Sequence, residues 1–209
     1  MGFYDSMIRG LAGFFCALYR VELVGAENIP EDTEQNGLPG FMLCSNHIAN
    51  LDPVVIIAAI RIKINWMAKD SLFRIPGLAQ LIRALGAYPV NRGGADVASI
   101  RRTLALLEAG AVVGIFPQGT RHGGKDPSLT PVKGGIGMIA WHGKATIVPA
   151  FIKTKGNRVR LFKKTELIIG DPIPFDALGM TKGGREEYQK AAETVFASIC
   201  ELGGYSRSL

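Results

Sequence analysis

The stretch FMLCSNHIANLDPVVIIAAI, residues 41–60, indicates the fold of the whole chain. Its first five residues form a nearly continuous apolar run, which is typical of a strand buried on both faces of a sheet. After a short polar interval, Asp52 and Pro53 supply the residue types that begin helices, an aspartate at the N-cap and a proline in the first turn. We therefore predict a strand over 41–45, a loop, and a helix over 52–60 with Asp52 as its N-cap.

The same alternation of apolar strands with helices continues along the chain. Further strands are predicted at 21–24, 64–68, 87–90, 111–116, 146–152 and 158–169, and further helices at 71–85, 96–109, 134–142 and 185–202. The helical region 71–85 is expected to be interrupted near Pro76-Gly77. Strands that alternate with helices predict an α/β fold, with a mixed, largely parallel central sheet flanked by helices.

The composition is that of a folded domain. Of the 209 residues, 47% are hydrophobic and 20% are charged, which supports a sizeable core and excludes wholesale disorder. The net charge is +6, but the sequence suggests neither a basic run nor an aromatic stacking motif, so we expect no nucleic-acid partner. Three widely spaced cysteines without a CxxC motif are typical of reduced thiols in a cytoplasmic protein.

The N-terminal residues differ from the rest of the chain. Residues 3–19 carry apolar side chains over most of a helical circumference, but charges leave only 11–19 uninterrupted. That length is too short for a spanning helix, which needs about 20 apolar residues. Such a helix either packs into the core or lies at a membrane interface. We predict the second arrangement: an N-terminal amphipathic membrane-interface helix over 1–20, followed by an α/β domain over 21–209.

A histidine and an aspartate five residues apart give the strongest chemical signal. His47 follows the carboxyl end of a predicted strand, where open α/β sheets place their ligands. If Asp52 accepts a hydrogen bond from its Nδ1–H, then Nε2 is left to remove a proton from a hydroxyl. The same spacing also fits a histidine that is merely hydrogen-bonded beside a helix cap.

The nature of the reaction follows from what the sequence lacks beside this pair. Neither Cys44 nor Ser45, which lie in the predicted strand, is marked as an activated nucleophile. The pair therefore points to direct attack by a substrate alcohol on an already activated acyl group.

Three cations follow the ends of other predicted strands. They are Lys69, Arg92 and Arg121. A guanidinium group binds phosphate through two parallel hydrogen bonds, and an ammonium group binds it as a point charge. Each cation alone also fits an ordinary surface charge. Together, at the same edge of the sheet as His47, they predict a phosphate site beside a general base.

Four blocks of residues occur in a fixed order along the chain. They are Asn46-His47-x4-Asp52-Pro53, Ala68-Lys69-Asp70-Ser71-Leu72-Phe73, Val90-Asn91-Arg92 and Phe116-Pro117-Gln118-Gly119-Thr120-Arg121, and the segments Lys133-Gly134-Gly135 and Ile147-Val148-Pro149-Ala150 complete the set. In this order they resemble the glycerolipid acyltransferase family, and within it the lysophosphatidic acid acyltransferases. The resemblance extends from about residue 21 to residue 174.

The resemblance implies roles for individual residues. His47 and Asp52 would form the catalytic dyad. The acceptor phosphate would be bound by Lys69, Arg92, Gly119, Thr120 and Arg121. Of these, Gly119 and Thr120 would shape the loop. Residues that support the motifs would be Asn46, Pro117, Gln118 and Pro149, with Val148-Pro149 on the acyl-donor side.

The resemblance also implies a reaction and its setting. A fatty acyl group would pass from acyl-CoA or acyl-carrier protein to the sn-2 hydroxyl of lysophosphatidic acid, giving phosphatidic acid in phospholipid biosynthesis. No metal and no other cofactor would be needed. The partners would be the acyl donor, the lysophospholipid acceptor and a membrane surface, with the protein peripheral or monotopic at the cytoplasmic face of the cell membrane.

One position departs from the family pattern. Gln118 stands where the family usually has glutamate. Glutamine keeps the length and the hydrogen-bonding reach without the charge, so we expect the phosphate site to tolerate it, with an effect on acceptor choice or activity. Two alternatives remain open: acyl transfer to glycerol-3-phosphate or another lysolipid, and a membrane lipid-binding protein with weakened catalysis.

Overall fold

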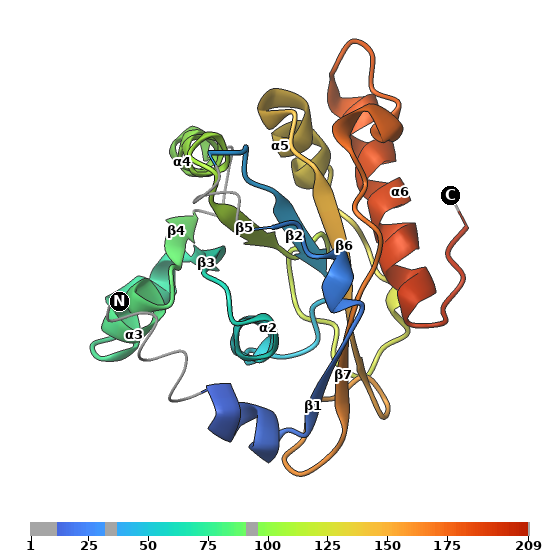
Figure 1. The fold of residues 1–209 in the computed structure, drawn as a ribbon. Helices are drawn as coiled ribbons and strands as arrows, with labels where there is room; N and C mark the ends of the chain where they lie inside the picture. The colour runs from blue at the N-terminus through green and yellow to red at the C-terminus, as the bar shows by residue number, and fades with distance from the viewer. Residues whose placement is uncertain (1–11, 32–36, 91–95, 209) are drawn as a thin grey trace.

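A computed structural model describes residues 12–31, 37–90 and 96–208. In that part of the chain, seven strands form one sheet in the order β1-β7-β6-β2-β5-β3-β4 (Figure 1). Their bounds are β1 Val21–Val24, β2 Met42–Ser45, β3 Ile64–Lys69, β4 Tyr88–Val90, β5 Val112–Ile115, β6 Ile147–Thr154 and β7 Thr165–Ile169. All neighbouring pairs are parallel except β6 and β7. The predicted mixed, largely parallel sheet is confirmed.

Helices cover both faces of this sheet. Their bounds are α2 Asp52–Ile60, α3 Leu78–Ala84, α4 Val97–Glu108, α5 Gly135–Gly143 and α6 Arg185–Leu202. Side chains of α4, α5 and α6 share one apolar core with the sheet, and those of α2 share the other (Figure 1). Along β2, Met42 and Cys44 belong to the first core and Leu43 to the second. Because side chains of a strand alternate between faces, a strand covered on both sides must be apolar throughout.

The start of α2 differs from its prediction. The helix begins at Asp52 itself, and Leu51 is the N-cap residue, so Asp52 is the first helical residue. The Asp52 carboxylate still accepts hydrogen bonds from backbone N–H groups, but these belong to the preceding loop. The carboxylate is therefore used to shape that loop.

Two other predicted segments are shorter than expected. The strand predicted over 158–169 is present only as β7. Residues 158–164 form no strand because most of their side chains are exposed and do not pack against another layer. The helical region 71–85 divides into a 3₁₀ helix, Asp70–Arg74, and α3, with the break at Pro76-Gly77 as predicted. Other 3₁₀ helices are Ala26–Asn28, Pro127–Leu129 and Phe175–Leu178.

The N-terminal residues that the structure describes lie against α2. Residues 12–18 are helical; Ala12 is buried, and Cys16 Sγ donates a hydrogen bond to the carbonyl of Ala58 at 3.4 Å (Figure 1). Phe14 points outward with 63% of its surface exposed. Within the described residues, no helix has the length and apolar character needed to cross a bilayer. Residues 1–11 lie outside the described part, so the interfacial helix over 1–20 stays a prediction.

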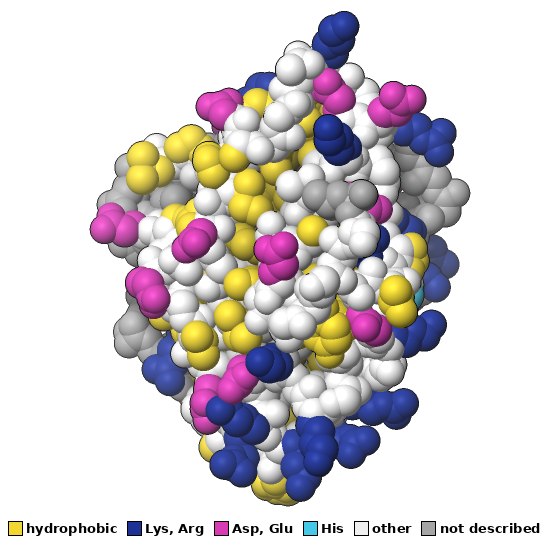
Figure 2. Space-filling model, turned by 90° about the vertical axis from the view of Figure 1, so that its right-hand side faces the viewer, with side chains coloured by type: hydrophobic (Ala, Val, Ile, Leu, Met, Phe, Trp, Pro, Cys, Tyr) yellow, Lys and Arg dark blue, Asp and Glu magenta, His cyan; other side chains and the backbone are white. Residues whose placement is uncertain are grey.

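Charges are unevenly distributed over the face that carries α6. Acidic, cationic and apolar side chains are mixed over most of it (Figure 2). Lysine and arginine gather toward its lower end, which is the end where the connection between β6 and β7 lies in Figure 1.

Candidate active site

His47 and Asp52 are in direct contact. Nδ1 of His47 lies 2.7 Å from Oδ2 of Asp52. The same oxygen accepts hydrogen bonds from the backbone N–H of Ile48 at 2.6 Å and of Ala49 at 2.8 Å. Asp52 is fully buried, whereas the His47 side chain keeps 12% of its surface exposed. The structure thus brings the predicted pair together, and with Nδ1–H donated to Asp52 the imidazole presents Nε2 as a base.

Asn46 fixes the point at which the chain leaves the sheet. Its buried side chain bonds to Ile152 of β6 in both directions, with Nδ2 donating to the carbonyl at 3.2 Å and Oδ1 accepting from the N–H at 2.7 Å. The backbone pairing of β2 with β6 ends one residue earlier, at Ser45 and Ala150. His47 is therefore the second residue after β2 and follows the carboxyl end of that strand, as predicted.

Two aromatic rings support the imidazole of His47. The ring of Phe116 stacks on it at a centroid distance of 4.0 Å and an interplanar angle of 10°. Phe116 in turn stacks with Trp66 at a centroid distance of 4.8 Å. A Cβ at Gly114 would lie 2.5 Å from the Trp66 ring, so glycine there leaves room for the stack. The sequence analysis assigned no role to Trp66 or Gly114, since only the sheet order brings β3 and β5 together beside β2.

Gln118 supports the loop that carries His47. Its side chain is buried; Oε1 accepts a hydrogen bond from the backbone N–H of His47 at 2.6 Å. Its Nε2 donates to Oγ1 of Thr130 at 2.7 Å, and that hydroxyl donates to the carbonyl of Pro127 at 2.7 Å. An uncharged amide fits this position because it must accept at one end and donate at the other. The effect of Gln118 on acceptor choice or activity stays a prediction.

Replacing Gln118 should destabilise this loop. We expect Gln118→Leu to lower the free energy of unfolding by about 1–3 kcal/mol, because the buried N–H of His47 loses its acceptor. Gln118→Glu is the matched variant: it can keep the bond to His47 but cannot donate to Thr130, so its loss should be smaller. Urea unfolding of the two variants measures this order, and equal stability of Gln118→Leu and the wild type would contradict the assigned role.

A cavity with two cations opens on one side of His47. Its volume is about 250 Å³, and we call it the cationic cavity; among its lining residues are His47, Asn50, Trp66, Lys69, Phe116 and Arg121. Nη1 of Arg121 donates to Oδ1 of Asn50 at 2.6 Å, which holds the arginine beside the dyad. Two of the three predicted phosphate-binding cations are therefore together here. Arg92 lies outside the described residues.

A larger cavity also reaches His47. Its volume is about 480 Å³, and we call it the apolar cavity; its lining includes His47, Met67, Val97, Ile100, Ile136 and Ile139. The walls come from α4, α5, β3 and β5. His47 and Phe116 line both cavities, so the imidazole stands where the two meet.

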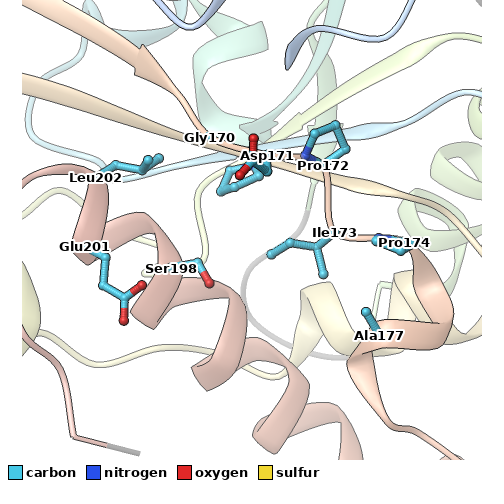
Figure 3. A pocket seen from close by; sticks show the side chains of 10 residues that line it. Gly170, Asp171, Pro172, Ile173, Pro174, Ala177, Ser198, Glu201 and Leu202 are labelled. Atoms are coloured by element: carbon cyan, nitrogen blue, oxygen red, sulfur yellow. The ribbon is translucent and has the colours of Figure 1, made fainter.

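The remaining predicted site residues lie in different places. Gly119 has a φ of 68° and lies close to the side chain of Lys133. It lines the apolar cavity and not the cationic one. Pro117 also lines the apolar cavity, and Thr120 is exposed. Pro149 lies inside β6 and lines a separate cavity of about 470 Å³ between the end of β7 and α6, whose other residues include Asp171, Ser198 and Glu201 (Figure 3). Pro149 lines neither of the two cavities that reach His47.

Comparison with known proteins places the chain in a family. The family model described as Acyltransferase matches residues 20–153, which include the dyad, Lys69 and the loop that carries Arg121. The chain belongs to the acyltransferase family. This confirms the resemblance drawn from the four sequence blocks, and it identifies the protein as an enzyme that transfers acyl groups.

Relatives of this acyltransferase carry more specific names. The 1-acyl-sn-glycerol-3-phosphate acyltransferase of Bacillus subtilis is 33% identical over 156 residues, 73% of each chain. That of Borreliella burgdorferi is 31% identical over 140 residues, 66% of this chain and 53% of its own. The crystal structure of the 1-acyl-sn-glycerophosphate (LPA) acyltransferase PlsC from Thermotoga maritima matches with a TM-score of 0.66 and 22% identity, over 98% of this chain and 80% of that one. The last match supports the fold.

Proposed function

We propose that the enzyme transfers a fatty acyl group from an acyl thioester to the sn-2 hydroxyl of lysophosphatidic acid, giving phosphatidic acid. The observation that carries this proposal is the position of His47, whose ring lines both a cavity with two cations and an apolar cavity. A phosphorylated lipid acceptor needs the first, and a fatty acyl chain needs the second. The names of the relatives from Bacillus subtilis and Borreliella burgdorferi agree with this acceptor.

The reaction needs only the dyad and the two substrates. Nε2 of His47 would remove the proton of the sn-2 hydroxyl as its oxygen bonds to the thioester carbonyl carbon. When the carbon–sulfur bond then breaks, the imidazolium would return that proton to the thiolate. Asp52, held by its three hydrogen bonds, would stabilise the imidazolium between these two steps. Neither step calls on a metal or another cofactor.

The donor and the acceptor can be identified in one experiment. The purified enzyme would be offered lysophosphatidic acid, glycerol-3-phosphate and neutral lysolipids, each with acyl-CoA and with acyl-carrier protein, and the products measured by mass spectrometry. We expect phosphatidic acid from lysophosphatidic acid with at least one of the two donors. If the enzyme acylated only glycerol-3-phosphate or another lysolipid, that compound would be the acceptor in place of lysophosphatidic acid. A folded protein that binds lysolipid without transfer would support the lipid-binding alternative.

Arg121→Ala should weaken acceptor binding more than chemistry. Because a hydrogen bond to a charged group contributes about 1.5–3 kcal/mol, we expect KM for lysophosphatidic acid to rise about 10- to 100-fold with a smaller change in kcat. Arg121→Lys keeps the charge but loses the paired hydrogen bonds, so its KM should be intermediate. A change confined to the KM of the acyl donor would contradict a phosphate role for Arg121.

We further propose that the enzyme works at the cytoplasmic face of the cell membrane. A lysophospholipid acceptor resides in a bilayer, so the active site must reach its surface. The outward-facing Phe14 in the helical residues 12–18 supports a contact of the N-terminal segment with lipid.

A further inference from the structure

The end of β6 and its connection to β7 concentrate the positive charge of the chain. Residues 153–164, KTKGNRVRLFKK, contain six of the 24 Lys and Arg residues and no acid. The other 197 residues therefore hold 18 cations and 18 acids, so this segment accounts for the entire net charge of +6. We call residues 153–164 the basic hairpin. The sequence analysis missed it because small and apolar residues separate the cations.

These cations face solvent. All six side chains of the basic hairpin are exposed: Lys153, Lys155, Arg158, Arg160, Lys163 and Lys164. Lys164 is held by ion pairs to Glu22 at 2.8 Å and Glu166 at 2.7 Å. Among the described residues, the other five form no ion pair within 4 Å that would neutralise them. They are available to an anionic partner.

The basic hairpin lies at the same edge of the sheet as the active site. Since β6 is parallel to β2, its carboxyl end points the same way as the end that carries His47. The carbonyl of Asn157 accepts a hydrogen bond from Gly124 N–H at 2.7 Å, and the Asn157 side chain donates to the carbonyl of Lys125 at 2.8 Å. In the same loop, His122 N–H donates to the carbonyl of His47 at 2.8 Å. The hairpin is thus joined to the loop that borders the dyad.

Two large apolar side chains lie among the cations. Leu161 is 50% exposed and its neighbour Phe162 is 67% exposed. Phe162 has a φ of 59°, which is unusual for an aromatic residue and implies a conformation held by its surroundings. Its N–H donates to the carbonyl of Leu18 at 2.8 Å, which ties the hairpin to the N-terminal helical residues that expose Phe14 (Figure 1). The lower end of Figure 2 shows this combination of cations with apolar side chains.

We propose that the basic hairpin is a membrane-contact site that binds anionic lipid and turns the mouth of the active site toward the bilayer. Lysine and arginine would bind lipid phosphates while Leu161 and Phe162 enter the interface. An anionic bilayer satisfies both features at once, whereas an acidic protein needs only the cations. The inference rests on the proposed function only in taking the acceptor to be a membrane lipid.

Vesicle binding tests the electrostatic part. The variant Lys155→Gln, Arg160→Gln, Lys163→Gln should bind vesicles of phosphatidylglycerol and phosphatidylcholine about a hundredfold more weakly at low salt, since each cation near such a surface contributes about fivefold. The matched control changes three exposed cations elsewhere, Arg101→Gln, Lys182→Gln and Lys190→Gln, and should bind as the wild type does. Equal loss in both variants, or no loss in the first, would overturn the proposal.

Insertion of the apolar tip is tested separately. In the Phe162→Trp variant, brominated lipids in anionic vesicles should quench the fluorescence of the introduced tryptophan. In the Leu38→Trp variant this fluorescence should not be quenched, because the exposed residue 38 precedes β2 and lies toward the opposite edge of the sheet. Equal quenching at the two positions, or none at residue 162, would refute insertion. The wild-type protein contains Trp66 and Trp141, and its fluorescence spectrum is subtracted from that of each variant.

The outcome is independent of turnover. Binding and quenching are measured without an acyl donor, so an inactive protein that binds through the hairpin would refute the proposed function alone. Conversely, active enzyme with unchanged vesicle binding by the hairpin variant would refute this inference alone. If that variant bound vesicles normally but its KM for acyl-carrier protein rose, the hairpin would be a docking site for an acidic protein.

Discussion

His47→Ala is expected to lower kcat for acyl transfer by about 10²–10⁴-fold, the contribution of a positioned general base. The imidazole is held between Asp52 and the ring of Phe116 where the two cavities meet, so the substitution removes the group that is positioned to accept the hydroxyl proton. The measurement is kcat at saturating lysophosphatidic acid and acyl donor. Thermal unfolding of the same sample establishes that the variant is folded.

The chain offers a matched histidine control. His142 in α5 is exposed and lines neither cavity beside the dyad, so His142→Ala should retain the activity of the wild type. A folded His47→Ala protein with turnover close to that of His142→Ala would show that His47 is not the base.

Asp52→Asn should separate the catalytic role of the carboxylate from its structural one. An asparagine oxygen can still accept from the backbone N–H groups of Ile48 and Ala49, so the free energy of unfolding should change little. The amide carries no charge to stabilise the imidazolium of His47, and kcat should fall by about 10²-fold or more.

Asp52→Ala completes this comparison. It removes the acceptor of three hydrogen bonds in a buried position, and each donor left unpaired costs about 1–3 kcal/mol. We expect loss of both activity and stability, measured by turnover and urea unfolding. If Asp52→Asn kept normal turnover, Asp52 would serve only to shape the loop before α2, which is the alternative that the HxxxxD spacing leaves open.

Local patterns in the sequence predicted most of the architecture. The apolar run at 41–45 became the central strand β2, and the break at Pro76-Gly77 divided the helical region as expected. The pattern failed at 158–164, where alternating cations and apolar residues look like a strand. Those side chains have no second layer to pack against, and burial, more than alternation, makes a strand.

The candidate site was predictable in part. His47 and Asp52 lie within one strand–loop–helix unit, so their contact depends on local geometry that six residues can specify. Gln118 was expected to support its motif, but the sequence did not show that it does so by bonding to the backbone of His47, 71 residues away. A motif reports which residue types occur together and not which atom each one contacts.

The sequence by itself determined the succession of strands and helices along the chain and the contact of His47 with Asp52, because these depend on periodicity and on contacts over a few residues. The class of reaction came from the resemblance of four ordered sequence blocks to a known family, which the family model supports. Only the tertiary structure decided the stack of Trp66 and Phe116 on His47, the two cavities and the position of the basic hairpin beside the active site. These depend on the strand order β6-β2-β5-β3, which places segments distant in sequence side by side. Such an order follows from packing both faces of the sheet at once, and no local stretch of the chain encodes it.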